Sequence, residues 1–484
     1  MTAISEAVIS EVVGQSVVKN DAFSKVTGKA RYTDDIDIPD LAWGLILRSP
    51  YAFCDVVSFD ISDALKVEGV LGVLLPEDVP QRVFNCSGNP PSPLLIPDER
   101  VLTRHALCVG DRIAAVAATT LSSCQKAVQA IRVEYSVKKP MFSIREAVAE
   151  NAPPIHPEIS GNNIVHTIRA SEGDVEKGLA ESDFVLEERF ATPAVQHTAL
   201  EPTACVCDFS DGEFLTVWSS SQTIFQERRI LSEIFEMPEN KIRFIKPAVG
   251  GGFGARQQLH NQHVAALLSK KIGRPVKIVN TREEEMHASV TRHEAETEIR
   301  MGFMNDGTIT ACHIRTWFNT GPYVTHGPTV VAASSRKLQY AAKDYLFEGY
   351  TVYTNAPTAG AMRGYGNPQI VYGRELLINR AARKLGIDPI ELRLQNHVKV
   401  GENFPSATYS ITSCSIEDCV KKALDARAAI DALAGEAIGK KSAWGVAFSC
   451  HTSGPSSKEG MSSAVIMVSD DGSIQLLIGS CDIG

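Results

Sequence analysis

Short apolar runs alternate with amphipathic stretches over the first part of the chain, and this pattern predicts strands combined with a helix. The runs LAWGLILRS, VVSFDI, GVLGVLL, DRIAAVAATT and RVEYSV have the length and the branched side chains of strands. LSSCQKAVQAI repeats its apolar residues at the spacing of a helix. We therefore expect a compact α/β unit over residues 21–138, preceded by a loose lead-in over residues 1–20.

A proline-rich stretch over residues 139–162 interrupts this pattern and is interpreted as a linker. After it, residues 163–430 alternate strand-like runs, among them DFVLEERF, CVCDFS and FLTVWSS, with amphipathic helices. A further unit begins within residues 431–484, where an Asp-Asp-Gly turn between two strand-like runs predicts a hairpin. The chain reaches Gly484 shortly after the second run, so we expect this last unit to be incomplete.

A glycine cluster, PAVGGGFGARQ, lies between the strand-like run KIRFIKPAV and the helix-like run QQLHNQHVAALLSKKIG, with the strand-like RPVKIVN next. Glycine loses more conformational freedom on folding than other residues, so three in succession indicate a close approach of the backbone to something else. We place the cluster in the strand-to-helix turn of a βαβ unit, where free N–H groups favour an anion. Arg256 adds a planar guanidinium suited to phosphate or carboxylate.

A second turn of this kind occurs in TAGAMRGYGNPQIVYGRELLINRAARKLG, where Arg363 lies among glycines ahead of a helix-like run. Asn367 suits the N-cap of that helix, Pro368 its first position and Gly386 its C-terminal end. Two glycine-rich turns, each with an arginine and each leading into a helix, favour one extended anionic cofactor held at both ends.

Two other interpretations of the first turn are weighed. A purely structural turn is one. The other is a nicotinamide-dinucleotide site, because Gly250, Gly252 and Ala255 fit the pattern G-x-G-x-x-A. That site needs an acidic residue at the end of the next strand, which here ends at Asn280, so the match is weak. The following run Arg282–Glu285 is interpreted as a solvated helix start.

Composition and charge disfavour several classes of protein. The chain has 484 residues and a formal net charge of −9, which disfavours binding to nucleic acid. Its eleven cysteines form no CxxC pair, which is typical of reduced thiols rather than a disulfide framework or an iron–sulfur site. The sequence shows no signal peptide and no apolar run of about 18 residues, so we expect a cytoplasmic protein without a membrane span.

Several motifs together resemble the molybdenum-binding subunit of the xanthine oxidase family. GGGFGAR and AMRGYGNPQ are similar to that family's two most recognisable motifs and occur in the same order. GKARYTDDIDIPDLAWGLILRSP resembles its N-terminal domain, HTALEPTACV its strand with a His…Glu-Pro pattern, and GSCDIG the start of its G-x-x-[DE]-x-G-Q-G motif. The resemblance covers roughly residues 12–484 and is greatest to bacterial xanthine dehydrogenases, with aromatic hydroxylases and 4-hydroxybenzoyl-CoA reductase also similar.

The resemblance implies a mixed α/β fold: a hammerhead-like domain over residues 21–138, a first molybdopterin-binding domain over 163–430 and the start of a second over 431–484. It implies a molybdopterin carrying molybdenum, often in the cytosine dinucleotide form, that oxidises an electron-poor carbon with oxygen from water. Electrons would leave through [2Fe–2S] clusters to FAD on partner subunits. The expected substrate is an N-heterocycle, with purines such as xanthine or hypoxanthine leading and aromatic, aldehyde or hydroxybenzoyl-CoA-type substrates as alternatives.

Site residues are carried over position by position. The resemblance assigns cofactor contacts to Gln222, Gly251, Gly252, Phe253, Gly254, Ala361, Met362 and Arg363. Gln222 corresponds to the glutamine that hydrogen-bonds the apical oxo group, and Phe253 and Gly254 to the pair beside the metal, with a backbone N–H facing an oxo ligand. Gln222, Phe253 and Arg363 would lie near molybdenum without binding it.

Each of these residues also has a structural alternative: Gln222 as a helix-start residue, Phe253 as a core residue and Arg363 as a solvated turn residue. His197 and Glu201 are interpreted as a structural pair near the core rather than as ligands.

Three positions depart from particular members of the family. The arginine that orients substrate in animal xanthine enzymes falls at Val331 and its glutamate partner at Gln257, which disfavours purine binding of that kind, although bacterial relatives also carry glutamine there. The copper-binding cysteine of carbon monoxide dehydrogenases falls at Gly364, which disfavours carbon monoxide as substrate. The family's general-base glutamate is expected beyond Gly484.

Two alternatives to a self-sufficient enzyme stay open. The chain could act only beside a separate C-terminal molybdopterin-binding chain. It could instead be an inactive truncated form or a nucleotide-binding scaffold that has kept the glycine turns.

Overall fold

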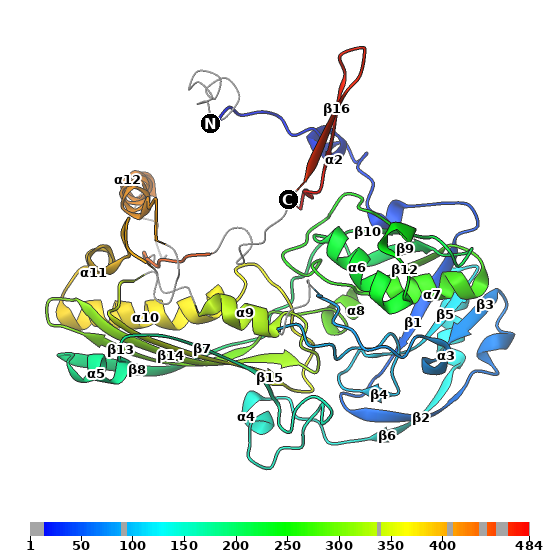
Figure 1. Cartoon of the computed structure of the whole chain (residues 1–484), viewed down its shortest axis with the longest axis horizontal. Helices are drawn as coiled ribbons and strands as arrows, with labels where there is room; N and C mark the ends of the chain where they lie inside the picture. The colour runs from blue at the N-terminus through cyan, green and yellow to red at the C-terminus, as the bar shows by residue number, and fades with distance from the viewer. Residues whose placement is uncertain are drawn as a thin grey trace.

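Two large β-sheets, one in each lobe of an elongated molecule, organise the chain (Figure 1). The computed structural model describes residues 14–88, 94–335, 340–403, 410–434, 443–451 and 463–483. The expected mixed α/β fold is confirmed, because helices and strands alternate through most of these ranges. Residues 1–13 of the expected lead-in lie outside the described residues, and so does Gly484.

The first lobe is built on a seven-stranded sheet with the order β11-β10-β9-β12-β1-β5-β3. Its strands are β1 (Ala42–Arg48), β3 (Val70–Leu74), β5 (Arg112–Ala118), β9 (Ala204–Asp208), β10 (Leu215–Ser219), β11 (Ile242–Ile245) and β12 (Val276–Val279). β1 pairs in parallel with β12 and antiparallel with β5. Strands from residues 21–138 and from residues 163–430 therefore share one sheet.

A smaller sheet and several helices complete this lobe. The small sheet contains β4 (His105–Ala106), β2 (Cys54–Asp60) and β6 (Arg132–Val137). The helices are α3 (Leu121–Ala130), α6 (Ile224–Phe235), α7 (Gln262–Ile272) and α8 (Arg282–His287), with 3-10 turns at Thr33–Asp35, Ala64–Lys66, Pro76–Asp78 and Glu239–Lys241. The short helix α2 (Ala22–Val26) buries no residue and lies above the lobe (Figure 1). Leu268 on α7 belongs to the same buried apolar cluster as Cys205 and Cys207 on β9. Burial raises the pKa of the Cys207 thiol.

The second lobe contains a five-stranded sheet with the order β7-β15-β14-β13-β8. Its strands are β7 (Ile164–Glu172), β15 (Asp344–Tyr353), β14 (Ile309–Gly321), β13 (Ala295–Phe303) and β8 (Phe184–Thr192). α9 (Gly327–Ser334) and α10 (Asn367–Leu385) cover one face, with α11 (Pro389–Asn396) against α10, while α4 (Ile144–Ala147) and α5 (Val175–Ala180) lie on the other (Figure 1). Ile299, Phe318 and Leu377 are buried between α10 and the sheet in one apolar cluster.

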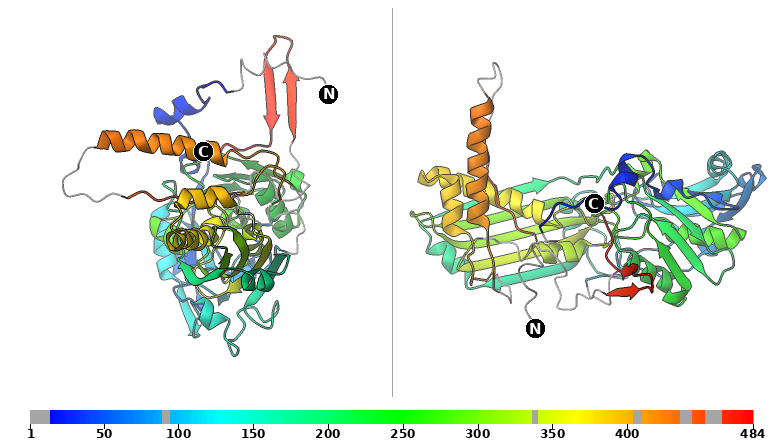
Figure 2. Two further views of the ribbon diagram at one scale, coloured as in Figure 1. Left: turned by 90° about the vertical axis from the view of Figure 1, so that its left-hand side faces the viewer. Right: turned by 90° about the horizontal axis from the view of Figure 1, so that it is seen from above.

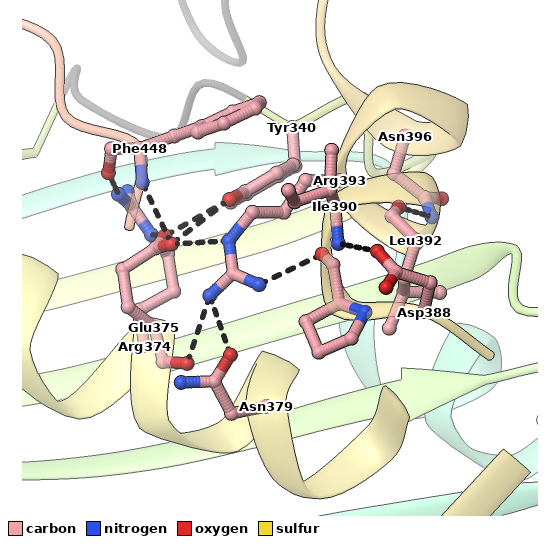
Figure 3. Close-up of polar contacts among 11 residues, drawn as sticks. Tyr340, Arg374, Glu375, Asn379, Asp388, Ile390, Leu392, Arg393, Asn396 and Phe448 are labelled. Atoms are coloured by element: carbon pink, nitrogen blue, oxygen red, sulfur yellow. Dashed lines mark hydrogen bonds and ion pairs between the residues drawn. The ribbon is translucent and has the colours of Figure 1, made fainter. Parts of the chain in front are cut away.

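A buried ionic network joins α10, α11 and the segment 443–451 (Figure 3). Glu375 accepts hydrogen bonds from Arg393 Nε at 2.9 Å, from the Tyr340 hydroxyl at 3.0 Å and from the Phe448 N–H at 2.9 Å. Arg374 Nη2 donates to the Phe448 carbonyl at 3.3 Å. The carboxylate therefore holds a chain segment that follows α12 (Ile416–Ala434) against a helix that precedes it.

The predicted hairpin forms from β16 (Ala464–Val468) and β17 (Ile474–Ile478), with Gly472 in the left-handed region at φ 80°. All residues of both strands are exposed, although most are apolar. The hairpin and α12 project away from the two lobes (Figures 1 and 2). Within the described ranges, no helix combines the length and the apolar character needed to cross a membrane.

Two buried aspartates of the first lobe join it to the second. Asp98 Oδ2 accepts hydrogen bonds from the Val324 N–H at 2.6 Å and from the Tyr353 hydroxyl at 2.9 Å. Asp111 Oδ2 accepts one from the Tyr323 hydroxyl at 3.0 Å. Burial raises the pKa of both aspartates because it disfavours the charged carboxylate.

Replacing Asp98 with asparagine is expected to stabilise the protein increasingly as pH rises. Because the native pKa of Asp98 is raised, its favourable contribution is complete below the unfolded pKa of about 3.9 and is lost as pH rises through the native pKa. Asparagine stays neutral and can accept both hydrogen bonds. Urea unfolding at pH 5.5 and 8 should show a stability advantage for D98N that is larger at pH 8, by roughly 1 kcal/mol.

Asp306 provides the control for this experiment. It is exposed, and hydrogen bonds from Thr308 lower the pKa of its carboxyl, so its contribution is complete above the unfolded pKa and constant between pH 5.5 and 8. D306N should therefore leave the pH dependence in this window unchanged. An advantage of D98N that shrinks with rising pH would show that Asp98 acts as a carboxylate at the contact between the lobes.

Candidate functional site

The first glycine turn forms a cradle of free backbone N–H groups. Gly251, Phe253 and Gly254 have φ of 111°, 51° and 107°, so the backbone bends through the left-handed region. In the described structure, the N–H groups of Gly251, Gly252 and Phe253 donate to no protein acceptor. Successive N–H groups in such a bend make an anion-binding concavity.

The helix after this turn begins later than the sequence pattern indicates. We expected it to start at Gln257, but α7 begins at Gln262, and residues 257–261 form bends and irregular backbone. The N–H groups of the turn, rather than the dipole of α7, therefore face the space in front of the cluster. β11 and β12 on either side are confirmed as strands.

Gln222 contacts the first turn. The side-chain Oε1 of Gln222 accepts a hydrogen bond from the Gly254 N–H at 3.0 Å. The backbone N–H of Gln222 donates to the Arg256 carbonyl at 2.8 Å. A Cβ on Gly252 would lie 2.6 Å from Gln222 Oε1, so a side chain at this position would require Gln222 to move. Because Gln222 Oε1 already accepts the hydrogen bond from Gly254, the orientation of the amide is set. The Nε2 group of Gln222 can therefore donate to a ligand, and it has no hydrogen-bond partner among the described residues.

This contact shows which N–H of the Phe253–Gly254 pair is available to a ligand. The N–H of Gly254 is hydrogen-bonded to Gln222 and does not face open space. The N–H groups of the turn that are available to a ligand are those of Gly251, Gly252 and Phe253.

The second glycine turn closes directly onto the first. The Arg363 N–H donates to the Phe253 carbonyl at 2.8 Å, and a Cβ on Gly254 would lie 2.5 Å from the Ala361 carbonyl oxygen. Ala361 is buried and Met362 half-buried, whereas Phe253 is 49% exposed and Arg363 is exposed. The guanidinium of Arg363 has no hydrogen-bond or ion-pair partner in the part of the chain that the structure describes.

The helix after the second turn follows the expectation to within one residue. α10 has Gly366 as its N-cap, with Asn367 and Pro368 as its first residues, whereas we expected Asn367 at the N-cap. Gly386 ends the helix in the left-handed region at φ 67°, as expected.

Arg256 does not offer its guanidinium to a ligand, contrary to the expectation. It is only 2% exposed, and it donates to Thr203 Oγ1 at 2.9 Å and to the Glu201 carbonyl at 2.7 Å. The Glu201 carboxylate in turn accepts from the Gly250 N–H at 2.7 Å. These bonds fix both ends of the glycine turn to the segment HTALEPTACV.

His197 and Glu201 do not form the pair that we expected. Glu201 contacts the first turn, whereas His197 Nε2 contacts the Ala361 carbonyl of the second at 2.8 Å and its Nδ1 the Val290 carbonyl at 3.1 Å. Burial lowers the pKa of His197. This segment therefore joins the two glycine turns from behind.

The acidic run after β12 is only partly solvated, which corrects the expectation for Glu285. Glu283 is exposed, but Glu285 is 7% exposed and accepts from the Thr203 N–H and from Asn280 Nδ2, both at 2.9 Å. Asn280 also accepts from Asn261 Nδ2 at 2.7 Å and so ties the end of β12 to the N-cap of α7.

Buried polar atoms without a partner gather around the turns. Burying a polar group without a hydrogen bond costs free energy, so such atoms indicate a bound polar group or water. Those in the segments that form or adjoin the two turns are Glu201 Oε1, Ser220 Oγ, Thr223 Oγ1, Arg256 Nε, Gln258 Oε1, Thr291 Oγ1, Asn367 Oδ1 and Gln369 Oε1. The free N–H groups of the first turn suit the anionic oxygens of a cofactor, whereas the unpartnered carboxylate and amide oxygens are acceptors and suit donor groups of a polar ligand or water.

A hydrogen-bonded cluster that the sequence reasoning missed ties α9 to both turns. The Tyr365 hydroxyl contacts His326 Nδ1 at 2.9 Å and Thr329 Oγ1 at 2.7 Å, and His326 Nε2 contacts the Gln257 carbonyl at 3.4 Å. Tyr365 has φ 43° and Thr325 φ 40°, a conformation that is uncommon outside glycine and frequent at functional sites. Burial lowers the pKa of His326 to about 4. The only feature of the sequence that could have indicated this cluster is the position of Tyr365 between two glycines.

The segment GSCDIG reaches the same region from the far end of the chain. Asp482 forms an ion pair with Lys19 at 3.3 Å, and its carbonyl accepts from Lys246 Nζ at 3.0 Å. Lys246 directly precedes Pro247, where the first glycine turn begins. The segment therefore lies beside the end of β11 that leads into the first glycine turn, although more than 200 residues separate Lys246 from Asp482.

The position that corresponds to the substrate-orienting arginine is buried in the core. Val331 on α9 is fully buried and packs against Gly349 of β15, so it does not face the turns.

Comparisons with known proteins add to this geometry. Residues 27–139 match the aldehyde oxidase and xanthine dehydrogenase a/b hammerhead domain, and residues 155–397 match the molybdopterin cofactor-binding domain. The putative xanthine dehydrogenase molybdenum-binding subunit of Escherichia coli K12 is 35% identical over 409 residues, which are 83% of this chain and 54% of that protein. The nicotinate dehydrogenase large molybdopterin subunit of Eubacterium barkeri is 32% identical over 417 residues, 85% of this chain and 96% of that protein.

Among solved structures, the aldehyde oxidoreductase of Desulfovibrio desulfuricans has the same fold, with a TM-score of 0.86 at 23% identity over 96% of this chain and 52% of that chain. The chain spans about half the length of the xanthine dehydrogenase subunit and nearly the whole length of the nicotinate dehydrogenase subunit.

Proposed function

Because the chain belongs to the xanthine oxidase family of molybdopterin-binding oxidoreductases, we propose that it forms the cofactor-binding part of a molybdenum hydroxylase catalytic subunit. The observation that carries the proposal is the closure of the two glycine turns through the Phe253 carbonyl and the Arg363 N–H, with three free N–H groups at the junction. A scaffold that had lost the cofactor would have no need to keep these donors unpaired.

The residues present fit the cofactor. The N–H groups of Gly251, Gly252 and Phe253 would donate to its anionic oxygens, Gln222 Nε2 would donate to an oxo group, and the Arg363 guanidinium would bind a further charged group. When bound, the molybdenum cofactor supplies the oxidation of an electron-poor carbon with oxygen from water.

The other assigned residues would shape the site. Ala361 and Met362 would line the second turn, and the exposed Phe253 ring would screen the cofactor from water. We propose that the bound cofactor is molybdopterin in its cytosine dinucleotide form.

The proposed substrate is a small N-heterocycle. Two relatives carry the names of enzymes for such compounds, xanthine and nicotinate. A purine is the leading candidate. Val331 occupies the position at which animal xanthine enzymes have the arginine that orients the substrate, so other groups would orient a purine here. An aldehyde or an aromatic acyl-CoA is the second candidate, since the fold is shared with an aldehyde oxidoreductase.

The proposed enzyme works with other polypeptide segments. Electrons would pass to [2Fe–2S] clusters and FAD on partner subunits, in the cytoplasm. The general base and further cofactor contacts would come from a second molybdopterin-binding unit, which the exposed apolar hairpin β16–β17 would join. The nicotinate dehydrogenase subunit, matched over 96% of its length, supports a version in which that unit is a separate chain. The domain division at residues 21–138, 139–162, 163–430 and 431–484 belongs to the same proposal.

The experiment that tests this function is the change of Arg363 to alanine in the assembled enzyme. The guanidinium has no protein partner, so the fold should persist with an unchanged melting temperature. A charge-assisted hydrogen bond contributes about 1.5–3 kcal/mol, so molybdenum measured by mass spectrometry should fall about tenfold or more where the cofactor is not in excess.

Arg292 is the control for this change, because it has the same charge and contacts the second turn through the backbone carbonyl of Arg363 at 2.7 Å. Its replacement by lysine should lower molybdenum content less. Unchanged molybdenum in R363A would refute the role of Arg363. Absence of molybdenum from the wild-type complex would favour the scaffold.

A further inference from the structure

A pocket at the end of the first lobe has the features of a small-molecule site. It has a volume of about 330 Å³, within the range of roughly 300–1,000 Å³ for ligand pockets. Its floor is apolar and is formed by Phe209, Phe235, Met237 and Leu267. Phe209 is 3% exposed and belongs to the main apolar cluster of the lobe, so the pocket opens directly onto the core.

Two lysines without a carboxylate partner stand at the pocket. Lys241 Nζ lies 3.7 Å from the centre of the Phe214 ring, and Lys270 Nζ lies 5.2 Å from that of Phe209. In the described ranges neither ammonium group forms an ion pair, and Glu213 is the one acidic residue in the lining. On a chain with a net charge of −9, this makes the pocket locally positive.

The nearby Asp211 does not neutralise the lysines by contact. Its carboxylate accepts from the N–H groups of Glu213 and Phe214 at 2.8 and 2.9 Å, which fix the turn between β9 and β10. Both ammonium groups therefore stay available to an anion.

The pocket lies at the opposite ends of the elements that carry the glycine-turn site. α6 begins beside Gln222 and ends at Phe235 in the pocket, and α7 begins after the glycine turn and carries Leu267 and Lys270 near its end. Each helix is roughly 16–18 Å long at 1.5 Å per residue. The pocket is thus separate from the proposed cofactor site.

We propose that this pocket binds an organic anion with a flat apolar body, of the class of aromatic carboxylates. The partly exposed Phe235 ring and Met237 accept a planar ring by stacking and dispersion, and the buried Phe209 ring supports them from below. The two ammonium groups supply charge-assisted hydrogen bonds to the carboxylate. An inorganic anion would leave the apolar floor uncovered, and a neutral aromatic compound would leave the lysines unpaired.

The test is a calorimetric titration of the full chain with 2-naphthoate. We expect a Kd of about 1 mM or tighter, weaker binding of the neutral 2-naphthylmethanol, and a Kd raised about tenfold in each of K241M and K270M. Leu267→Trp, which fills the pocket without changing charge, should abolish binding. Melting temperatures of all variants establish that they are folded.

Lys271 provides the matched control. It is adjacent to Lys270 but pairs with Asp78 at 3.1 Å and does not line the pocket, so K271M should bind as the wild type does. Equal binding in wild type, K241M and K270M would overturn the proposal, because the anion would then be held elsewhere, for example at the glycine turns. Absence of binding at several millimolar would also overturn it.

Discussion

Replacing Glu375 with alanine is expected to lower the free energy of unfolding by about 3–5 kcal/mol. The carboxylate is 4% exposed and lies between Arg374 and Arg393, both fully buried (Figure 3). Its removal leaves two guanidinium groups in the core without this partner, which costs far more than the loss of a surface ion pair. It also removes the acceptor for the Phe448 N–H, so segment 443–451 loses an anchor.

Chemical denaturation followed by circular dichroism measures this effect, and limited proteolysis reports the release of segment 443–451. Glu391 on α11 is exposed and serves as the control, with an expected change below about 0.5 kcal/mol in E391A. Glu375→Gln keeps one acceptor oxygen and should fall between wild type and alanine. Equal unfolding midpoints for E375A and E391A would contradict the network as a determinant of stability.

Changing Gly254 to alanine is expected to leave the purified enzyme with less than about a tenth of its molybdenum, because the substitution separates the two glycine turns. The residue has φ 107°, and its Cβ would lie 2.5 Å from the Ala361 carbonyl oxygen and 2.8 Å from Met362 Cα. Both neighbours are backbone atoms, so relief requires the turns to move apart. That movement would break the bond between the Arg363 N–H and the Phe253 carbonyl.

Gly273 is the control for backbone strain without a clash. It has φ 65° at the end of α7, and no atom lies within 4 Å of its Cβ position. G273A should cost about 1–2 kcal/mol of stability and keep its molybdenum. Normal molybdenum in G254A would show that the closure of the turns is not needed to hold the cofactor.

The sequence predicted the secondary structure of this protein well, since each strand and helix depends on a local pattern. The apolar spacing in LSSCQKAVQAI is enough to give one face of α3, and the alternation in DFVLEERF gives β8. The Asp-Asp-Gly turn required a residue at positive φ, which Gly472 provides. The two glycine turns and Gln222 were also found from sequence, because their motifs are contiguous.

Tertiary structure alone decided how these elements meet. The apolar sequence of a strand such as β1 predicts that the strand is buried, but it does not predict which strand it pairs with. β1 pairs with β12, which is more than 200 residues away in the sequence. Arg256 looked like an anion-binding residue, but burial against Glu201 and Thr203 made it a structural donor. His326 and Tyr365 form one cluster through contacts that no local pattern contains. The sequence thus determined which segments could hold an anion, whereas the long-range packing of the two lobes decided which of their polar groups are left free to do so.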